Sequence, residues 1–203
     1  GRVSGVKVVA PFFRSGEAEE SETKNISAEI VVNCAGLWGR QVGKMAGVNI
    51  PLHAAEHFYI VTEDIGLPST LPVLRDPSGW IYAKEDAGKM LVGCFEPESK
   101  PRPLDTITKD FSFDQFEEDW DHFEPAMLNA IHRIPKLEDV GIHTFFNGPE
   151  SFTPDDRYIL GEAPELKNFF VAAGFNSIGI QSGGGAGKVL SEWITKGYPP
   201  LDL

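Results

Sequence analysis

Short apolar runs, bounded by glycine, proline or charged residues, predict most of the secondary structure of this chain. Residues 3–9 and 26–34 are predicted strands, and the continuous apolar run that ends the second is typical of a strand buried on both faces. The polar, glutamate-rich segment 14–25 predicts a solvated hairpin loop between them. Residues 37–46 have helical spacing. The first part of the chain therefore mixes strands with one helix.

After this helix the pattern of hydrophobic and polar residues changes, and shorter alternating runs follow. They read HFYIVTE at 57–63, GWIYAKE at 79–85 and KMLVGCFE at 89–96. Period-two alternation with such boundaries predicts an antiparallel, strand-rich region. Residues 96–110 contain three prolines and predict a long loop.

One longer segment of this region predicts a helix. Residues 114–133 place aromatic and aliphatic side chains at helical spacing, and Pro125 is expected to kink or restart that helix. A further strand is predicted at 139–147, and the proline- and aspartate-rich segment 149–156 predicts a turn.

The last part of the chain predicts a strand at 168–173, a glycine-rich connection at 174–187 and a helix at 188–195. Two familiar phosphate-binding patterns fail here. Ser182 stands where a P-loop requires its first glycine, and Lys188 stands where a dinucleotide fingerprint requires its third. Two explanations stay open: backbone N–H groups at the helix start bind a negatively charged ligand, or the glycines allow close packing of helix on strand.

Composition narrows the function classes. The 203 residues are 41% hydrophobic and 24% charged, which is typical of a globular protein. Thirty acidic residues against 18 basic ones give a net charge of −12, which argues against nucleic-acid binding and against docking on an anionic membrane. No apolar run approaches the roughly 20 residues that span a bilayer. Cys34 and Cys94 lie in apolar runs and are predicted to be buried free thiols, as in a reducing compartment.

Candidate catalytic patterns from the residues alone are few. His53 and His57 are four residues apart, but in a predicted strand they share one face without converging, so this spacing does not support a metal site, and no CxxC is present. No G-x-S-x-G segment supports a serine nucleophile. Asp155 and Asp156 follow a proline and indicate a turn before they indicate a catalytic carboxylate.

Longer motifs carry a resemblance to a known family. Residues 30–51, IVVNCAGLWGRQVGKMAGVNIP, and the closing segment 149–194 resemble FAD-dependent amine oxidoreductases of the D-amino-acid-oxidase superfamily. In that family a buried strand ends in N-x-A-G, and a late strand leads into G-F-x-x-x-G and a helix. Segments 51–63, 74–86 and 147–166 most resemble the dimethylglycine dehydrogenase and sarcosine dehydrogenase branch.

The resemblance implies an α/β (α+β) fold. Residues 1–50 and 146–203 would form part of an FAD-binding dinucleotide fold, and residues 51–145 an antiparallel substrate-binding domain. The G-x-G-x-x-G unit and the flavin-attachment histidine of the family have no counterpart in these residues. We therefore expect an internal piece of a longer protein, the second half of its catalytic domain.

The resemblance also implies which residues approach FAD. The end of the first buried strand and the loop before the last helix would lie along the flavin, where helix N–H groups stabilise the negative charge that reduction creates. These cofactor positions are Asn33, Cys34, Ala35, Gly36, Trp38, Gly174, Phe175, Asn176, Ser177, Gly179 and Ile180.

On the substrate side the resemblance points to His57 and Tyr82. An N-methyl amine must be neutral before it loses a hydride. A histidine and a phenol hydroxyl can control its protonation and orient the substrate. Packing of Tyr82 in a strand, with its hydroxyl hydrogen-bonded, is the structural alternative.

The expected function is oxidation of a small-molecule methylamine, dimethylglycine or sarcosine, by hydride transfer to FAD, with tetrahydrofolate binding to a domain outside this chain and an undetermined electron acceptor. The alternatives are a regulatory relative of the same fold, linked to pyruvate dehydrogenase phosphatase, and a binding module without catalysis. We expect the isolated chain to be inactive, to hold little FAD and to self-associate. The expected compartment is the cytoplasm in bacteria or the mitochondrial matrix in eukaryotes.

Overall fold

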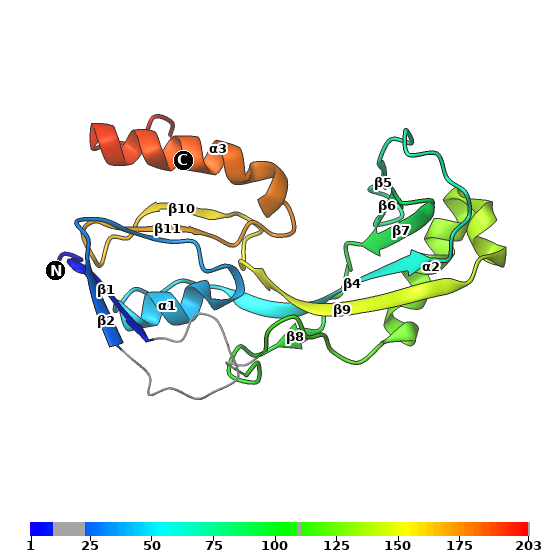
Figure 1. Ribbon diagram of the computed structural model, residues 1–203, viewed down its shortest axis with the longest axis horizontal. Helices are drawn as coiled ribbons and strands as arrows, with labels where there is room; N and C mark the ends of the chain where they lie inside the picture. Colours follow the sequence, from blue (N-terminus) through cyan, green and yellow to red (C-terminus); the bar gives the residue numbers. More distant parts are fainter. Residues whose placement is uncertain (10–22, 109–110, 203) are drawn as a thin grey trace. The chain divides into compact units, whose positions relative to one another are not determined.

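The computed structural model describes residues 1–9, 23–108 and 111–202. The chain divides into two compact units, which are described separately (Figure 1). Unit 1 comprises Gly1–Leu52 and Ser151–Leu203, and unit 2 comprises His53–Glu150.

Unit 1 contains two small sheets. One is an antiparallel pair, and the other has the order β10-β11-β3, in which β11 pairs antiparallel with β10 and parallel with β3. The strands are β1 (Gly5–Val9), β2 (Thr23–Ser27), β3 (Val31–Asn33), β10 (Ile159–Glu162) and β11 (Phe169–Ala173).

Helices lie on both sides of the three-stranded sheet of unit 1, with α3 on one side and α1 on the other (Figure 1). The helices are η1 (Gly36–Trp38), α1 (Gly39–Met45) and α3 (Gly179–Lys196). The core of this unit joins the segment that leads to Leu52 with one face of β11, through residues that include Ile50, Leu52, Phe169 and Val171. The core therefore fixes the strand from which the glycine-rich segment departs.

Unit 2 is built on a six-stranded sheet with the order β5-β6-β7-β4-β8, and β9 also pairs with β4. Its strands are β4 (His53–Thr62), β5 (Leu74–Asp76), β6 (Ile81–Asp86), β7 (Lys89–Cys94), β8 (Pro101–Arg102) and β9 (Ile142–Phe152), and its helices are α2 (Trp120–Arg133) and η2 (Pro135–Asp139). Strand β9 runs on into unit 1 at its last residues.

The two faces of this sheet differ in chemistry. Phe58, Ile81 and Val92 share a core with Phe123 of α2 and are almost completely buried. Side chains alternate along each strand, so the residues between these core positions point to the opposite face. Polar and aromatic residues such as His57, Tyr59 and Tyr82 lie there. The first face is therefore part of the structural core of unit 2.

Residues paired across antiparallel strands point to the same face. Arg75 pairs with Tyr82, Tyr82 with Gly93, and Gly93 with Tyr59. His57 lies two residues before Tyr59 and therefore belongs to the same face. We call this the tyrosine face.

Several predicted elements differ from the structure. The predicted strand 26–34 is two strands in different sheets, β2 and β3, because only its last residues form an apolar run. The predicted loop 14–25 lies outside the described residues up to residue 22, and its last three residues belong to β2.

The glycine-rich connection is also shorter than predicted. Helix α3 begins at Gly179, so only residues 174–178 connect it to β11 and the glycine run forms helical turns. Strand β9 extends through the first half of the turn predicted at 149–156.

The predicted helix 114–133 begins only at Trp120. The side chain of Asp119 accepts a hydrogen bond from the backbone N–H of His122 and caps the first turn. Pro125 lies within this helix rather than restarting it. In the described part of the chain, no helix is long and apolar enough to cross a membrane.

Candidate functional site

The carboxyl ends of β3 and β11 define one candidate region in unit 1. The two strands are parallel, and Asn33 pairs with Val171. The segments that follow, 34–38 and 174–178, therefore leave the sheet at the same edge. Ligands of α/β sheets bind outside the carboxyl ends of parallel strands.

The turn after β3 is held by Asn33, which is 3% exposed. Its amide Nδ2 donates a hydrogen bond to the carbonyl of Gly39 at 2.8 Å, and its Oδ1 accepts one from the N–H of Ala35 at 3.1 Å. Asn33 thus shapes the turn with its own side chain. Cys34 projects outward and is exposed, so the prediction of a buried thiol is wrong here. Trp38 is half-buried in the turn before α1.

The loop after β11 is anchored on Thr153. Gly174 has φ +67°, and a Cβ at this position would lie 2.4 Å from Cγ2 of Thr153, so only glycine fits. The Asn176 Oδ1 accepts a hydrogen bond from the Thr153 N–H at 3.0 Å, and its Nδ2 donates one to the Thr153 Oγ1 at 3.0 Å. Phe175 stacks on Tyr158 with ring centroids 5.1 Å apart. The loop therefore has a defined shape.

The first turn of α3 comprises Gly179, Ile180, Gln181 and Ser182, and a run of glycines follows it. Gly183, Gly184, Gly185 and Gly187 lie in its first half, and a Cβ on any of them would meet no described residue within 4 Å. Close packing against the described chain therefore does not explain these glycines. Ile180 is exposed.

This edge fits a flavin in its chemistry. The first N–H groups of an α-helix have no partner within the helix and attract negative charge. Helix α3 begins directly after the ordered loop at 174–178 with Gly179, and the glycines that leave open space around the helix begin at Gly183, in its second turn. The predicted cofactor positions lie at the end of β3 (Asn33), in the two segments that follow β3 and β11, and at the start of α3.

Unit 2 holds the second candidate region, on the tyrosine face. The His57 Nδ1 lies 2.8 Å from the Glu96 Oε2, and the backbone N–H of Phe58 donates to the Glu96 Oε1 at 3.0 Å. A carboxylate only accepts hydrogen bonds, so Nδ1 carries the proton. Glu96 is 6% exposed and uses both oxygens to fix the imidazole.

The pKa of His57 is set by opposing effects. Burial is the largest and lowers the pKa, but the hydrogen bond to Glu96 and the charges of Glu96 and Glu150 together raise the pKa above its usual 6.5. The Nε2 atom lies 3.6 Å from the Glu150 Oε2. His57 is therefore a stronger base than a free histidine.

Tyr82 lies across Gly93 of the neighbouring strand. A Cβ at Gly93 would lie 2.1 Å from the Tyr82 Cζ, so the ring occupies the space above a residue without a side chain. Burial, followed by the negative charges that Cys94, Glu96 and Glu150 can carry, raises the pKa of Tyr82 to about 12. The phenol therefore keeps its proton at neutral pH and can donate a hydrogen bond.

Phe95 connects these groups. Its ring centroid lies 6.0 Å from that of His57 and 5.6 Å from that of Tyr82, and the Arg75 guanidinium carbon lies 4.5 Å from it. We call Phe95 with these three residues the Phe95 cluster. Beside it, Tyr59 stacks on Phe146 with centroids 4.5 Å apart.

The structure thus places His57 and Tyr82 on one face and around one ring. Sequence reasoning missed Glu96 and Phe95, which follow strand β7 in the run that ends KMLVGCFE. It also missed Glu150, which had been assigned to a turn. The signal that could have found them is their position at strand ends beside a predicted histidine strand. Cys94 is buried as predicted, and burial raises the pKa of its thiol.

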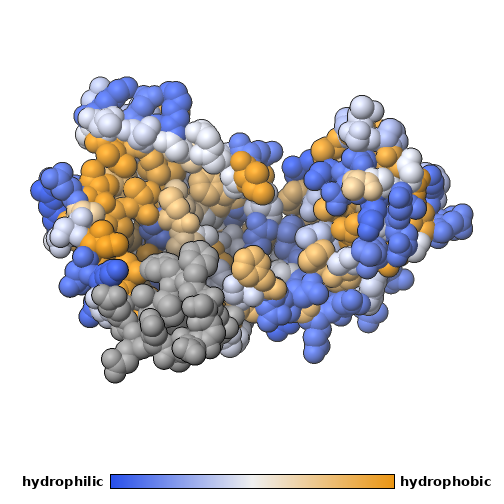
Figure 2. All heavy atoms as spheres, in the orientation of Figure 1, coloured by the Kyte–Doolittle hydropathy of each residue, from blue (hydrophilic) through white to orange (hydrophobic). Residues whose placement is uncertain are grey.

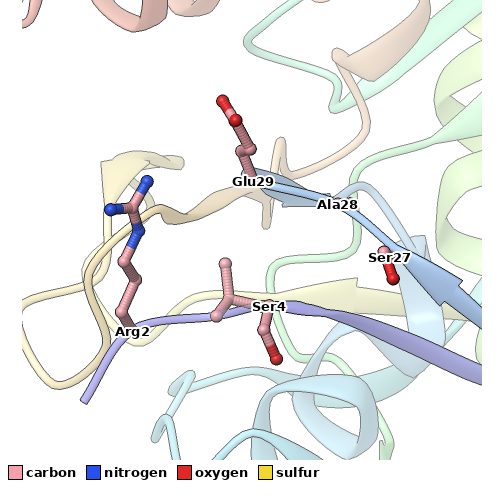
Figure 3. A pocket seen from close by; sticks show the side chains of 6 residues that line it. Arg2, Ser4, Ser27, Ala28 and Glu29 are labelled. Atoms are coloured by element: carbon pink, nitrogen blue, oxygen red, sulfur yellow. The ribbon is translucent and has the colours of Figure 1, made fainter.

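Two other surface features of unit 1 contain none of the predicted site residues. Figure 2 shows apolar side chains gathered over the three-stranded sheet of unit 1, where Val32 is among the exposed apolar residues. Near the β1–β2 pair, a hollow of about 430 Å³ is lined by residues that include Arg2, Ser4 and Glu29. Figure 3 shows the Arg2 and Glu29 side chains extending to the same side of this hollow, and Ser4 pointing the other way. None of these residues was a predicted site residue.

A family comparison identifies the class to which this fold and these residues belong. The model of the family described as "FAD dependent oxidoreductase" (DAO) matches residues 1–193. The chain belongs to this FAD-dependent oxidoreductase family. The predicted resemblance is confirmed.

Among curated relatives, the chain is 42% identical over 203 residues to the mitochondrial sarcosine dehydrogenase of Mus musculus, which covers 99% of the chain and 22% of that protein. It is 36% identical over 193 residues to the mitochondrial dimethylglycine dehydrogenase of Homo sapiens (91% and 22%). It is 43% identical over 185 residues to the mitochondrial pyruvate dehydrogenase phosphatase regulatory subunit of Mus musculus (89% and 21%). The chain therefore spans about a fifth of the length of these relatives.

A solved structure supports the fold. The L-proline dehydrogenase of P. horikoshii superposes with a TM-score of 0.73 at 23% identity, covering 96% of this chain and 51% of that chain. The predicted mixed α/β class with antiparallel sheets is confirmed.

Proposed function

We propose that the complete protein oxidises an N-methyl amino acid, dimethylglycine or sarcosine, by hydride transfer to FAD. The observation that carries this proposal is the pairing of a carboxylate-held imidazole, His57 with Glu96, with the protonated phenol of Tyr82 on one face of a sheet. The identities of 42% and 36% to sarcosine and dimethylglycine dehydrogenases support the substrate class.

The residues of unit 1 that would hold the flavin are those at 33–38, 174–178 and the first turn of α3. Their backbone N–H groups would stabilise negative charge on the bound cofactor. When bound, FAD supplies the acceptor for the hydride that leaves the N-methyl carbon.

The residues of unit 2 would prepare the substrate. The unprotonated Nε2 of His57 accepts the proton of the substrate ammonium and leaves the nitrogen lone pair free. Glu96 stabilises the imidazolium that forms, and the Tyr82 hydroxyl donates a hydrogen bond that orients the substrate. Water or tetrahydrofolate would then capture the iminium product, and tetrahydrofolate would bind outside these 203 residues.

A second candidate is a regulatory role without amine oxidation. The 43% identity to a pyruvate dehydrogenase phosphatase regulatory subunit favours it. A common fold does not distinguish the two functions. For either function we place the protein in the mitochondrial matrix if its source is a eukaryote and in the cytoplasm if it is a bacterium.

The test is anaerobic reduction of the flavin in the complete polypeptide that carries this chain. Dimethylglycine or sarcosine should bleach the visible flavin absorbance in a single turnover, and the amino acid should lose one methyl group, whose carbon is released as formaldehyde when water captures the iminium. A flavin that stays oxidised with both substrates would contradict the proposed activity and favour the regulatory role.

A further inference from the structure

A cavity of unit 2 lies between the first turns of helix α2 and the residues that flank strands β6 and β7. Its volume is about 380 Å³, within the range of about 300–1,000 Å³ that small-molecule pockets occupy. Neither His57 nor Tyr82 lines it, so it is separate from the proposed substrate site on the tyrosine face. The lining residues used below are Trp80, Cys94, Glu96, Pro97, Asp121, Pro125 and Ala126.

Trp80 supplies the aromatic part of the lining, and local hydrogen bonds fix its position. Its carbonyl accepts a hydrogen bond from the Phe95 N–H at 2.7 Å, and the carbonyl of Gly79 accepts one from the Asn129 Nδ2 of α2 at 3.0 Å. The segment is thereby tied both to the end of β7 and to α2. Trp80 is nevertheless 41% exposed, so a ligand can reach the indole, whose face attracts cations.

The charged part of the lining is negative. Asp121 is exposed and lies in the first turn of α2, where the helix N-terminus stabilises its charge. No lysine or arginine lines the cavity in the described part of the chain. Two cations of unit 2 are paired with other carboxylates, Lys100 with Asp119 and Arg133 with Asp76. The cavity therefore attracts a positively charged ligand.

The apolar part of the lining limits which cations fit. Pro97, Pro125 and Ala126 have no hydrogen-bonding group in their side chains, and the indole N–H of Trp80 only donates. A primary ammonium would lose hydrogen bonds to water and find few acceptors in exchange. A quaternary ammonium has no N–H groups to satisfy, and its alkyl groups gain from contact with apolar walls.

The wall opposite in sequence, at the end of β7, has a fixed shape. Cys94 is 2% exposed. The Glu96 carboxylate is held by the His57 ring at 2.8 Å and by the Phe58 N–H at 3.0 Å. Such ordered walls keep a binding site formed before its ligand arrives.

We propose that this cavity binds a small quaternary ammonium ion, whose charge is met by Asp121 and by the indole of Trp80. The proposal goes beyond the proposed function and does not rest on it, because none of its evidence comes from the flavin site or from the substrate chemistry of the tyrosine face.

The experiment uses the complete polypeptide, with tetramethylammonium as the probe and tert-butanol as its uncharged counterpart of similar size. Binding is followed by the NMR relaxation of the methyl protons of each probe. Tetramethylammonium should bind saturably. Its Kd should be about tenfold or more below that of tert-butanol, because only the cation interacts with the indole face and the carboxylate.

Two cavity variants and two matched controls locate the binding. Trp80→Leu replaces the aromatic face with an apolar side chain, and Asp121→Asn removes only a charge. Each should raise the Kd for tetramethylammonium about threefold or more. Trp120→Leu and Glu124→Gln are the controls, since Trp120 is 43% exposed, Glu124 is exposed on the same helix, and neither lines the cavity. Both controls should bind tetramethylammonium like the unaltered protein.

Thermal unfolding of each variant identifies any that has not folded. Asp121→Asn changes only an exposed side chain, so it keeps the test available if Trp80→Leu fails to fold. The proposal would be overturned by the lack of saturable tetramethylammonium binding, or by equal affinity for tert-butanol. An unchanged Kd in a folded cavity variant, or an equal loss of affinity in the controls, would overturn it as well.

Discussion

At the scale of single residues, Glu96 acts on chemistry through another side chain. It accepts hydrogen bonds from the His57 ring and from the Phe58 N–H at the same time, and both bonds need an oxygen acceptor. A glutamine offers one oxygen and one NH₂ group. It could serve only one of these two donors, so Glu96 is a positioning residue that a carboxamide cannot replace.

We predict that Glu96→Gln shifts the pH dependence of turnover. Deprotonated His57 is the proposed base, so kcat/KM should rise with pH through a pKa above 6.5 in the unaltered protein. Loss of the Glu96 charge destabilises the imidazolium, so this limb should move to lower pH and the plateau should fall about tenfold or more.

The measurement is the pH profile of kcat/KM for dimethylglycine. Glu98→Gln is the matched control, since Glu98 is exposed and lies two residues further along the same loop. An unchanged limb in Glu96→Gln would show that Glu96 does not set the basicity of His57.

Gly93 has no side chain, and the ring of Tyr82 occupies the space that a side chain there would fill. We predict that Gly93→Ala lowers the free energy of unfolding by about 1–3 kcal/mol, because the new methyl group would overlap the Tyr82 ring in a packed sheet. Urea unfolding would measure this. Gly148→Ala in β9 is the control, since a Cβ there meets no described residue within 4 Å. Equal stability of the two variants would contradict the close approach of Tyr82 to Gly93.

The sequence predicts only some of the residues of the candidate site. His57 and Tyr82 came from resemblance alone, and their roles stay predictions. Glu96 and Phe95 could not be placed, because they lie beyond the end of β7 and only pairing of β4 with β7 brings them to His57. Local periodicity does not predict which strands pair or in which register.

At the scale of elements, strand periodicity was the strongest signal. The runs around His57, Tyr82 and Met90 correspond to β4, β6 and β7. Helix limits were weaker, because Asp119 rather than the apolar spacing decides where α2 begins. The glycine run predicts a connection, since glycine disfavours helix by about 1 kcal/mol per residue, yet in the structure it lies within α3.

The loop between β11 and α3 depends on Asn176, which has φ 48° and two side-chain contacts to Thr153. We predict that Asn176→Ala lowers stability by about 1–3 kcal/mol through lost hydrogen bonds and an unfavourable left-handed backbone. It should also raise the Kd for FAD in the complete polypeptide about tenfold, because the loop is a proposed flavin contact.

Asn168→Ala is the control for this loop. Asn168 also has a positive φ of 66° and hydrogen-bonds to the Glu29 carbonyl, but it lies before β11, outside the proposed flavin contacts. Both variants should unfold more easily, and only Asn176→Ala should lose flavin. Similar flavin retention in both, by absorbance after gel filtration, would remove the loop from the cofactor site.

At the scale of the whole molecule, the composition argues against some classes of function but does not identify one. The net charge of −12 and the mixed α/β fold suit a soluble-ligand enzyme and a regulatory subunit equally. The two units have separate cores, one joining β11 with the segment up to Leu52 and one joining the unit 2 sheet with α2. The separate roles proposed for cofactor and substrate follow this division.

We predict that the purified 203-residue chain contains far less than one FAD per molecule and self-associates. The predicted flavin contacts lie in short segments of unit 1, and apolar side chains such as Val6, Ile26 and Val32 are exposed there. The visible flavin absorbance per molecule and light scattering would test this. A yellow monomer with stoichiometric flavin would contradict both expectations.

The central claim is that His57 and Tyr82 prepare an N-methyl amino acid for oxidation, and the rate of flavin reduction in a single anaerobic turnover tests it most directly. His57→Gln and Tyr82→Phe in the flavin-loaded complete polypeptide should each reduce with dimethylglycine about 10²-fold more slowly than the unaltered protein, the usual scale for a lost acid–base group. Unchanged rates in both variants, with flavin fully retained, would contradict the account.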